Sequence, residues 1–179
     1  DVTRKSRLYM KALQAGGIIT VAKHFPGHGD TDTDSHQALP LIHHSAAMLD
    51  SLDIYPFRKL IKDGLDGIMV GHLFVPALDS TKNLPSSLSP LIVDNLLRKK
   101  MGFKGLVFTD ALDMKGVSNS EKPGYVELRA LQAGNDVLLL SVSVAKAVDA
   151  IKQALDSGYF SNDELALHCK RILTYKYRS

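Results

Sequence analysis

The sequence has no tryptophan and only one cysteine, Cys169, in 179 residues. A single cysteine can form neither an intramolecular disulfide nor a cysteine-based metal site, and Cys169 falls in a helical pattern where a small buried side chain is expected. Apolar runs are short, and none approaches the roughly 20 residues that a membrane-spanning helix needs. The glycines form no phosphate-binding loop, because Gly27-His28-Gly29 matches neither the dinucleotide-binding nor the Walker pattern.

An excess of one charge sign is also missing. The net charge is +3 at pH 7, and the basic residues are scattered apart from two clusters at expected helix ends, 98–100 and 170–178. Because no basic stripe alternates with aromatic side chains, the sequence does not indicate a nucleic-acid partner. Hydrophobic residues make up 45% of the chain, which is enough for one core, so we expect residues 1–179 to belong to one domain.

Short apolar runs and helical patterns alternate along the chain. Four runs predict buried strands, over 17–22, 67–71, 106–109 and 136–140. The helical patterns cover 2–15, 45–62, 89–102, 125–133, 144–155 and 161–175. The strands do not alternate between apolar and polar residues, which is typical of a parallel sheet covered on both faces. The order predicts an α/β fold, and a doubly wound sheet and a (β/α)8 barrel both fit it.

Titratable side chains gather where the predicted strands end. The loop after the first run contains Lys23, His24 and further histidines and aspartates up to residue 36, and a loop this polar faces water or a ligand. His72 follows the second run and Asp110 the third. Because parallel strands end at the same edge of a sheet, these groups could converge on one site. Taken one at a time, each of them is explained more simply by ordinary loop polarity or helix capping.

Two groups in this set suggest acid/base or nucleophilic chemistry. Asp34 and His36 are two residues apart, so in an extended segment the carboxylate can orient the imidazole as a general acid/base, although a loop-pinning hydrogen bond fits equally well. Asp110 could be a nucleophile, a metal ligand or a helix N-cap, and spacing alone favours the cap. Asp113 is expected to be a surface residue or a helix cap.

A metal site is a weaker possibility. His24, His28, Asp30, Asp34 and His36 offer nitrogen and oxygen ligands, but no established metal-binding spacing connects them. We therefore predict no metal and no other cofactor.

The segment Lys23-His24-Phe25-Pro26-Gly27-His28-Gly29-Asp30-Thr31, with Asp34-Ser35-His36 after it, resembles the signature of family 3 glycoside hydrolases in their β-N-acetylglucosaminidase branch. Residues 101–116 are similar to the segment around that family's nucleophile, and Gly71-His72 to the preceding strand end. The resemblance runs through nearly the whole chain in the right order.

This resemblance implies a (β/α)8 barrel of which the chain is the C-terminal half, with about four βα units. It implies a retaining exo-enzyme that releases terminal β-linked N-acetylglucosamine from cell-wall muropeptides or chitooligosaccharides. Asp110 would be the nucleophile and His36 the acid/base, with Asp34 as its partner. Lys23 and His24 would bind sugar hydroxyls.

Two alternatives stay open beside this interpretation. A phosphorylase could use the same site, because an imidazole acid/base does not repel phosphate as a second carboxylate would. The chain could also be an inactive, truncated piece that serves as a scaffold, because family members carry another half-barrel before this segment. We expect such an upstream half-barrel to be required, and isolated residues 1–179 to fold poorly or to associate.

Overall fold

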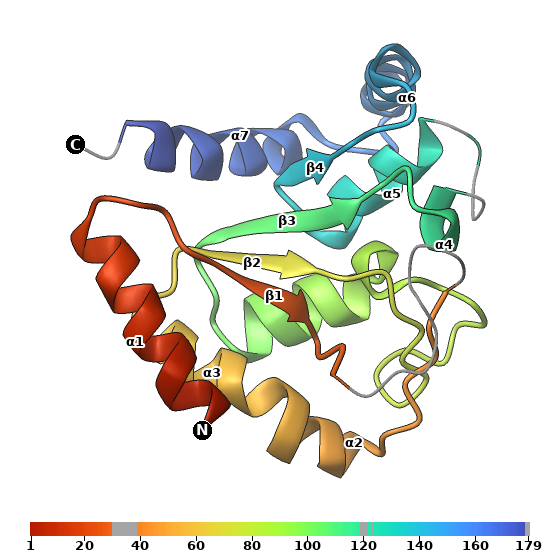
Figure 1. The fold of residues 1–179 in the computed structure, drawn as a ribbon. Coiled ribbons are helices and arrows are strands. Elements are labelled where there is room, and N and C mark those ends of the chain that lie inside the picture. The colour runs from red at the N-terminus through yellow and green to blue at the C-terminus, as the bar shows by residue number, and fades with distance from the viewer. Residues whose placement is uncertain (30–38, 119–121, 123, 178–179) are drawn as a thin grey trace.

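The computed structural model describes residues 1–29, 39–118, 122 and 124–177. Its centre is a parallel sheet of β1 (Val21–Phe25), β2 (Gly67–Val70), β3 (Leu106–Ala111) and β4 (Val137–Leu139), paired in the order of the chain. The arrowheads of all four strands point the same way (Figure 1). A doubly wound sheet would reverse its strand order, whereas each strand here adds beside the previous one. The α/β prediction is confirmed, and the order is that of half a (β/α)8 barrel.

Helices connect and flank the strands. In chain order they are α1 (Val2–Ala15), α2 (Ala46–Met48), the π-helical turn η1 (Leu49–Asp53), α3 (Ile54–Lys62), the 3-10 turn η2 (Ser86–Leu88), the π-type helix η3 (Leu91–Lys100), α4 (Lys115–Ser118), α5 (Tyr125–Ala133), α6 (Val144–Asp156) and α7 (Asn162–Lys176). Their starts follow the local sequence, because Ser45 caps α2 and Ser161 forms a capping box with Glu164 before α7. Among the described residues, no helix combines the length and apolarity needed to cross a membrane.

The main core lies between the helices and one face of the sheet. Phe25, Ile68, Val70 and Val107 from the strands are buried there with apolar side chains of α3 and η3. On the other face, Val21 is 39% exposed, and Met69, Phe108, Val137 and Leu139 are only partly buried. This other face, called the inner face of the sheet below, is therefore apolar but incompletely covered by the described chain.

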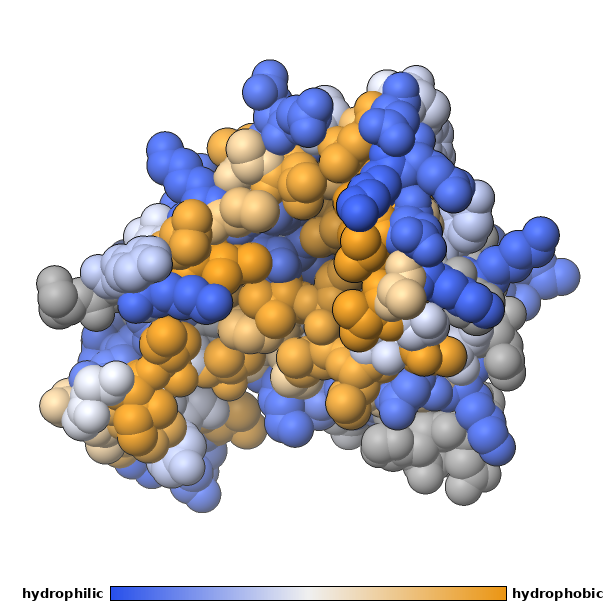
Figure 2. All heavy atoms as spheres, turned by 90° about the horizontal axis from the view of Figure 1, so that it is seen from above, coloured by the Kyte–Doolittle hydropathy of each residue, from blue (hydrophilic) through white to orange (hydrophobic). Residues whose placement is uncertain are grey.

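Exposed apolar side chains are also found toward the end of the chain. Seen from the side where α6 and α7 lie in Figure 1, the molecule shows a hollow surrounded by apolar side chains (Figure 2). Large hydrophobic side chains are exposed in the loop between β4 and α6, on α6 and on α7. They include Leu140, Val142, Val144, Val148, Leu167 and Leu173.

The structure corrects the predicted position of the first strand. Ile18 and Ile19 are 54% and 46% exposed, and the strand begins only at Val21, four residues after the predicted start. The chain leaves α1 through Gly17, whose φ is +77°, and first pairs with β2 where Gly67 N donates to the carbonyl of Thr20. Lys23 and His24 therefore belong to the strand, and the peptide bond between them is cis.

Cys169 is also placed differently from the prediction. It is exposed on α7, whereas the preceding residue, His168, is the buried residue of that helix. Neighbouring residues on a helix point about 100° apart, so packing of His168 against the body of the protein directs Cys169 to the surface.

Candidate active site at the ends of three strands

Three titratable side chains meet at the carboxyl ends of β1, β2 and β3. His24 Nε2 lies 3.6 Å from Asp110 Oδ2, and these side chains are 26% and 20% exposed. His72 is buried under the same strand ends and contacts the chain next to Asp110. The expected convergence of these groups is confirmed, and it brings a carboxylate and an imidazole together at an accessible edge.

Asp110 is held by the end of its own strand. The register between β3 and β4 shifts between Phe108 and Ala111, which is the irregularity that re-aims side chains beside many active sites. Oδ1 of Asp110 accepts a hydrogen bond from the amide of Ala111 at 2.9 Å, and Oδ2 faces His24. The N-cap that spacing favoured is wrong, because the next helix begins only at Lys115. Asp113 is exposed, as expected.

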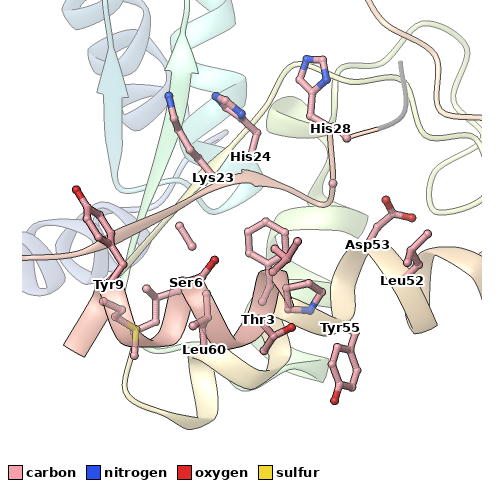
Figure 3. A pocket seen from close by; sticks show the side chains of 18 of the residues that line it. Thr3, Ser6, Tyr9, Lys23, His24, His28, Leu52, Asp53, Tyr55 and Leu60 are labelled. Atoms are coloured by element: carbon pink, nitrogen blue, oxygen red, sulfur yellow. The ribbon is translucent and has the colours of Figure 1, made fainter. Parts of the chain in front are cut away.

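His24 stands in a half-buried position beside Asp110. Burial lowers the pKa of His24, the negative charge of Asp110 opposes this shift, and the nearby Lys23 and His28 add to it. The ring is therefore mainly neutral near pH 7 and can both donate and accept a hydrogen bond. Figure 3 shows Lys23, His24 and His28 directed away from α1, and the two histidine rings meet edge to face with centroids 5.8 Å apart.

His72 is the buried member of the group. It is 1% exposed, its Nδ1 lies 2.7 Å from Ser87 Oγ, and its Nε2 lies 3.0 Å from the carbonyl oxygen of Ala111. The sequence drew attention to His72 as a strand-end residue, but Ser87 was missed because it lies 15 residues further on, in η2.

Asp53 lies beside two residues, Gly27 and His44. His44 Nδ1 lies 2.7 Å from Asp53 Oδ2, and a Cβ on Gly27 would meet Asp53 Cβ at 2.6 Å. Asp53 comes from η1, and such π-helical turns are frequent at functional sites. Asp34 and His36, the predicted acid/base pair, lie outside the described residues, and so does Asp30.

Gly27 is expected to be the most sensitive glycine of this segment. Its φ is +141° and Asp53 leaves no space for a Cβ, so Gly27→Ala should destabilise the full-length protein by about 1–3 kcal/mol in a denaturant titration. Gly29→Ala is the matched control, because no atom of the described residues lies within 4 Å of its Cβ position. Equal denaturation midpoints for the two variants would contradict this packing argument.

A cavity of about 840 Å³ opens beside the site, between α1, β1 and α3. Thr3, Ser6 and Tyr9 of α1 line one side, while Lys23 and His24 of β1 belong to its rim (Figure 3). In the described part of the chain, no three His, Cys, Asp or Glu side chains are grouped as metal ligands would be.

Comparison with known proteins gives a consistent picture. The family model described as glycosyl hydrolase family 3 N terminal domain matches residues 1–175. A β-hexosaminidase A from Pseudoalteromonas piscicida is 32% identical over 98% of this chain and 32% of its own length. A β-hexosaminidase from Nitrosospira multiformis is 38% identical over 73% of this chain and 37% of its own length.

Solved structures agree with the curated relatives. A family 3 β-N-acetylglucosaminidase from Paenibacillus sp. FPU-7 superposes with a TM-score of 0.93 at 37% identity, covering 99% of this chain and 34% of the other. A structure named beta-glucoside phosphorylase BglX reaches a TM-score of 0.92 at 26% identity, covering 97% of this chain and 33% of the other. The chain thus spans about a third of the length of these proteins.

Proposed function

The chain belongs to glycoside hydrolase family 3, and on that premise we propose that it forms the nucleophile-bearing half of the catalytic barrel of a retaining exo-β-N-acetylglucosaminidase. The single observation that carries the proposal is the Asp110 carboxylate, presented at a strand end with His24 3.6 Å away. The names of the relatives, β-hexosaminidase and β-N-acetylglucosaminidase, support a glycan with terminal β-linked N-acetylglucosamine as the substrate class. We propose cell-wall muropeptides or chitooligosaccharides as the source of this glycan.

The proposed chemistry is a double displacement. Asp110 Oδ2 attacks the anomeric carbon, the bond to the leaving oxygen breaks, and His36 gives that oxygen a proton. Water then gives a proton to His36 and attacks the anomeric carbon, which releases the Asp110 carboxylate. Two displacements retain the anomeric configuration. A histidine has an unperturbed pKa of about 6.5, so His36 can perform both proton transfers near neutral pH, with Asp34 orienting its ring.

Lys23 and His24 are proposed to hold the sugar. Both extend from β1 on the side away from α1, and His24 lies next to the proposed nucleophile (Figure 3). The ammonium group of Lys23 can donate to hydroxyl oxygens, and the neutral ring of His24 can donate to one hydroxyl or accept from it. Such contacts would place the anomeric carbon above Asp110.

We also propose that further strands, preceding β1 in the full-length protein, complete one catalytic barrel domain with residues 1–179. The inner face of the sheet keeps Met69, Phe108 and Val137 only partly buried, and in the described chain β1 pairs with β2 alone. The cavity between α1, β1 and α3 lies along this edge, where an additional strand and helix would bury its apolar lining.

An assay of the full-length protein tests the proposed function. The substrate is an aryl β-N-acetylglucosaminide, with and without inorganic phosphate, and the product is followed by NMR. We expect turnover without phosphate and β-configured N-acetylglucosamine as the first product. A phosphate requirement with a sugar 1-phosphate product would assign the phosphorylase activity instead, and no turnover under either condition would refute the proposal.

A further inference from the structure

The buried histidine beneath the proposed nucleophile has no role in the chemistry described above. His72 follows β2 and is 1% exposed, and Ser87 beside it is 0% exposed. A buried imidazole is unfavourable unless both ring nitrogens are hydrogen-bonded, and here both have a partner, Ser87 Oγ at 2.7 Å and the Ala111 carbonyl at 3.0 Å. An apolar side chain would fill the same space without this requirement, so the polar pair needs another explanation.

The partners determine where the proton of His72 sits. A carbonyl oxygen can only accept, so the ring carries its hydrogen on Nε2 and donates it to Ala111. Nδ1 is then an acceptor, and the Ser87 hydroxyl donates to it. Burial lowers the pKa of His72, the hydrogen bond to Ala111 and the charge of Asp110 oppose this shift, and His24 adds to it. The ring is accordingly neutral, with one tautomer selected by the Ala111 carbonyl and accommodated by the Ser87 hydroxyl.

Ala111 connects this pair to Asp110. Its amide donates to Asp110 Oδ1 at 2.9 Å, while its carbonyl accepts from His72. One residue therefore links the nucleophilic carboxylate to the buried ring, at the point where the pairing of β3 with β4 is irregular. A strand end with an irregular ladder needs an additional contact if the orientation of its side chains is to be fixed.

We propose that His72, hydrogen-bonded to Ser87 on one ring nitrogen and to the Ala111 carbonyl on the other, is a positioning residue that fixes the Asp110 carboxylate through Ala111. This inference rests on the proposed function, since Asp110 must be the nucleophile for its orientation to affect the rate. Oδ1 is held by the Ala111 amide, and Oδ2 is left to face the substrate. A misplacement of about 1 Å in such a group can cost 10²-fold in rate.

The test compares kcat and KM of full-length variants on an aryl β-N-acetylglucosaminide. Ser87→Ala removes the proton donor to Nδ1, and His72→Asn removes the donor at the Nε2 position. Each should lower kcat about 10- to 100-fold while KM changes by less than about threefold. His72→Gln should retain more activity than His72→Asn, because its longer side chain can place an amide N–H near the Ala111 carbonyl.

Ser89→Ala is the matched control. Ser89 is also a fully buried serine of this segment, but its hydroxyl bonds Asp79 and the first turn of η3. It should lower the thermal unfolding temperature without lowering kcat. If His72→Asn does not fold, Ser87→Ala alone decides.

Two negative outcomes are distinguishable. An active wild type whose Ser87→Ala variant keeps its kcat, or loses no more than Ser89→Ala does, would overturn the role of His72 alone. A wild type without turnover would overturn the proposed function and this inference with it.

Discussion

Asp110→Ala is expected to lower kcat of the full-length enzyme by a factor on the order of 10⁴ or more, as loss of a covalent nucleophile does in other hydrolases. No described neighbour can replace it, because the other groups at these strand ends, Lys23, His24 and His72, are not carboxylates. KM should change little, since Asp110 acts mainly in the transition state. Initial rates on an aryl β-N-acetylglucosaminide give both constants.

Asp113→Asn is the matched control for Asp110→Ala. It removes an exposed carboxylate three residues away and should leave kcat within about threefold of wild type. Azide adds a second readout, because a small anion can enter the space vacated by Asp110. The Asp110→Ala variant should then form the α-configured glycosyl azide. Wild-type activity of Asp110→Ala would show that the nucleophile is assigned wrongly.

Asp136→Asn is expected to produce the largest loss of stability, about 3–5 kcal/mol in the free energy of unfolding. The side chain of Asp136 is 0% exposed and accepts hydrogen bonds from Arg98, His168, Arg171 and the amide of Val107. It thereby ties η3 and α7 to the start of β4. Replacing the carboxylate with an amide would leave buried positive charge without its counterion.

Asp50→Asn is the control for the stability measurement. Asp50 also pairs with an arginine, Arg58, but these side chains are 54% and 42% exposed, so the pair should contribute less than about 1 kcal/mol. Denaturant titrations of the full-length protein measure both variants. A similar small loss for Asp136→Asn and Asp50→Asn would contradict a central role for the buried cluster.

The pH dependence of the Asp136 contribution has a defined sign. Burial alone would raise the pKa of Asp136, but the hydrogen bond from His168 and the charge of Arg98 outweigh it and hold the pKa below its usual value. A carboxyl group with a lowered pKa stabilises the fold above its unfolded pKa of about 3.9, and this contribution is lost as pH falls through the folded pKa. The difference between wild type and Asp136→Asn should therefore narrow below about pH 4.

Local signals in the sequence predicted the helices well. The helix over 125–133 is observed as α5, and the capping box at Ser161 and Glu164 starts α7 as expected. These features depend on residues within one or two turns of each other, which the sequence displays directly. The start of the first strand was misplaced because it does not depend on local residues. Only pairing with β2, 46 residues away, defines where this strand begins.

Features that depend on distant residues could not be predicted. The basic cluster 98–100 lies at a helix end as expected, but the sequence does not show that Arg98 is buried. Arg98 is only 7% exposed because Asp136, 38 residues later, binds it. Ser87 could be recognised as a partner of His72 only once η2 had folded against residues 71–73, which follow β2. The roles of Asp34 and His36 stay predictions, as do those of Lys23, His24 and Asp110.

The proposed role of Asp110 is tested most directly by trapping the covalent intermediate on the full-length enzyme. A 5-fluoro-N-acetylglucosaminyl fluoride should form a covalent bond with the nucleophile that hydrolyses only slowly. Tryptic digestion then yields the peptide 105–115, which contains both Asp110 and Asp113. Fragment ions are expected to place the added sugar on Asp110. A sugar on Asp113 or on another peptide, in an enzyme that the reagent inactivates, would contradict this role.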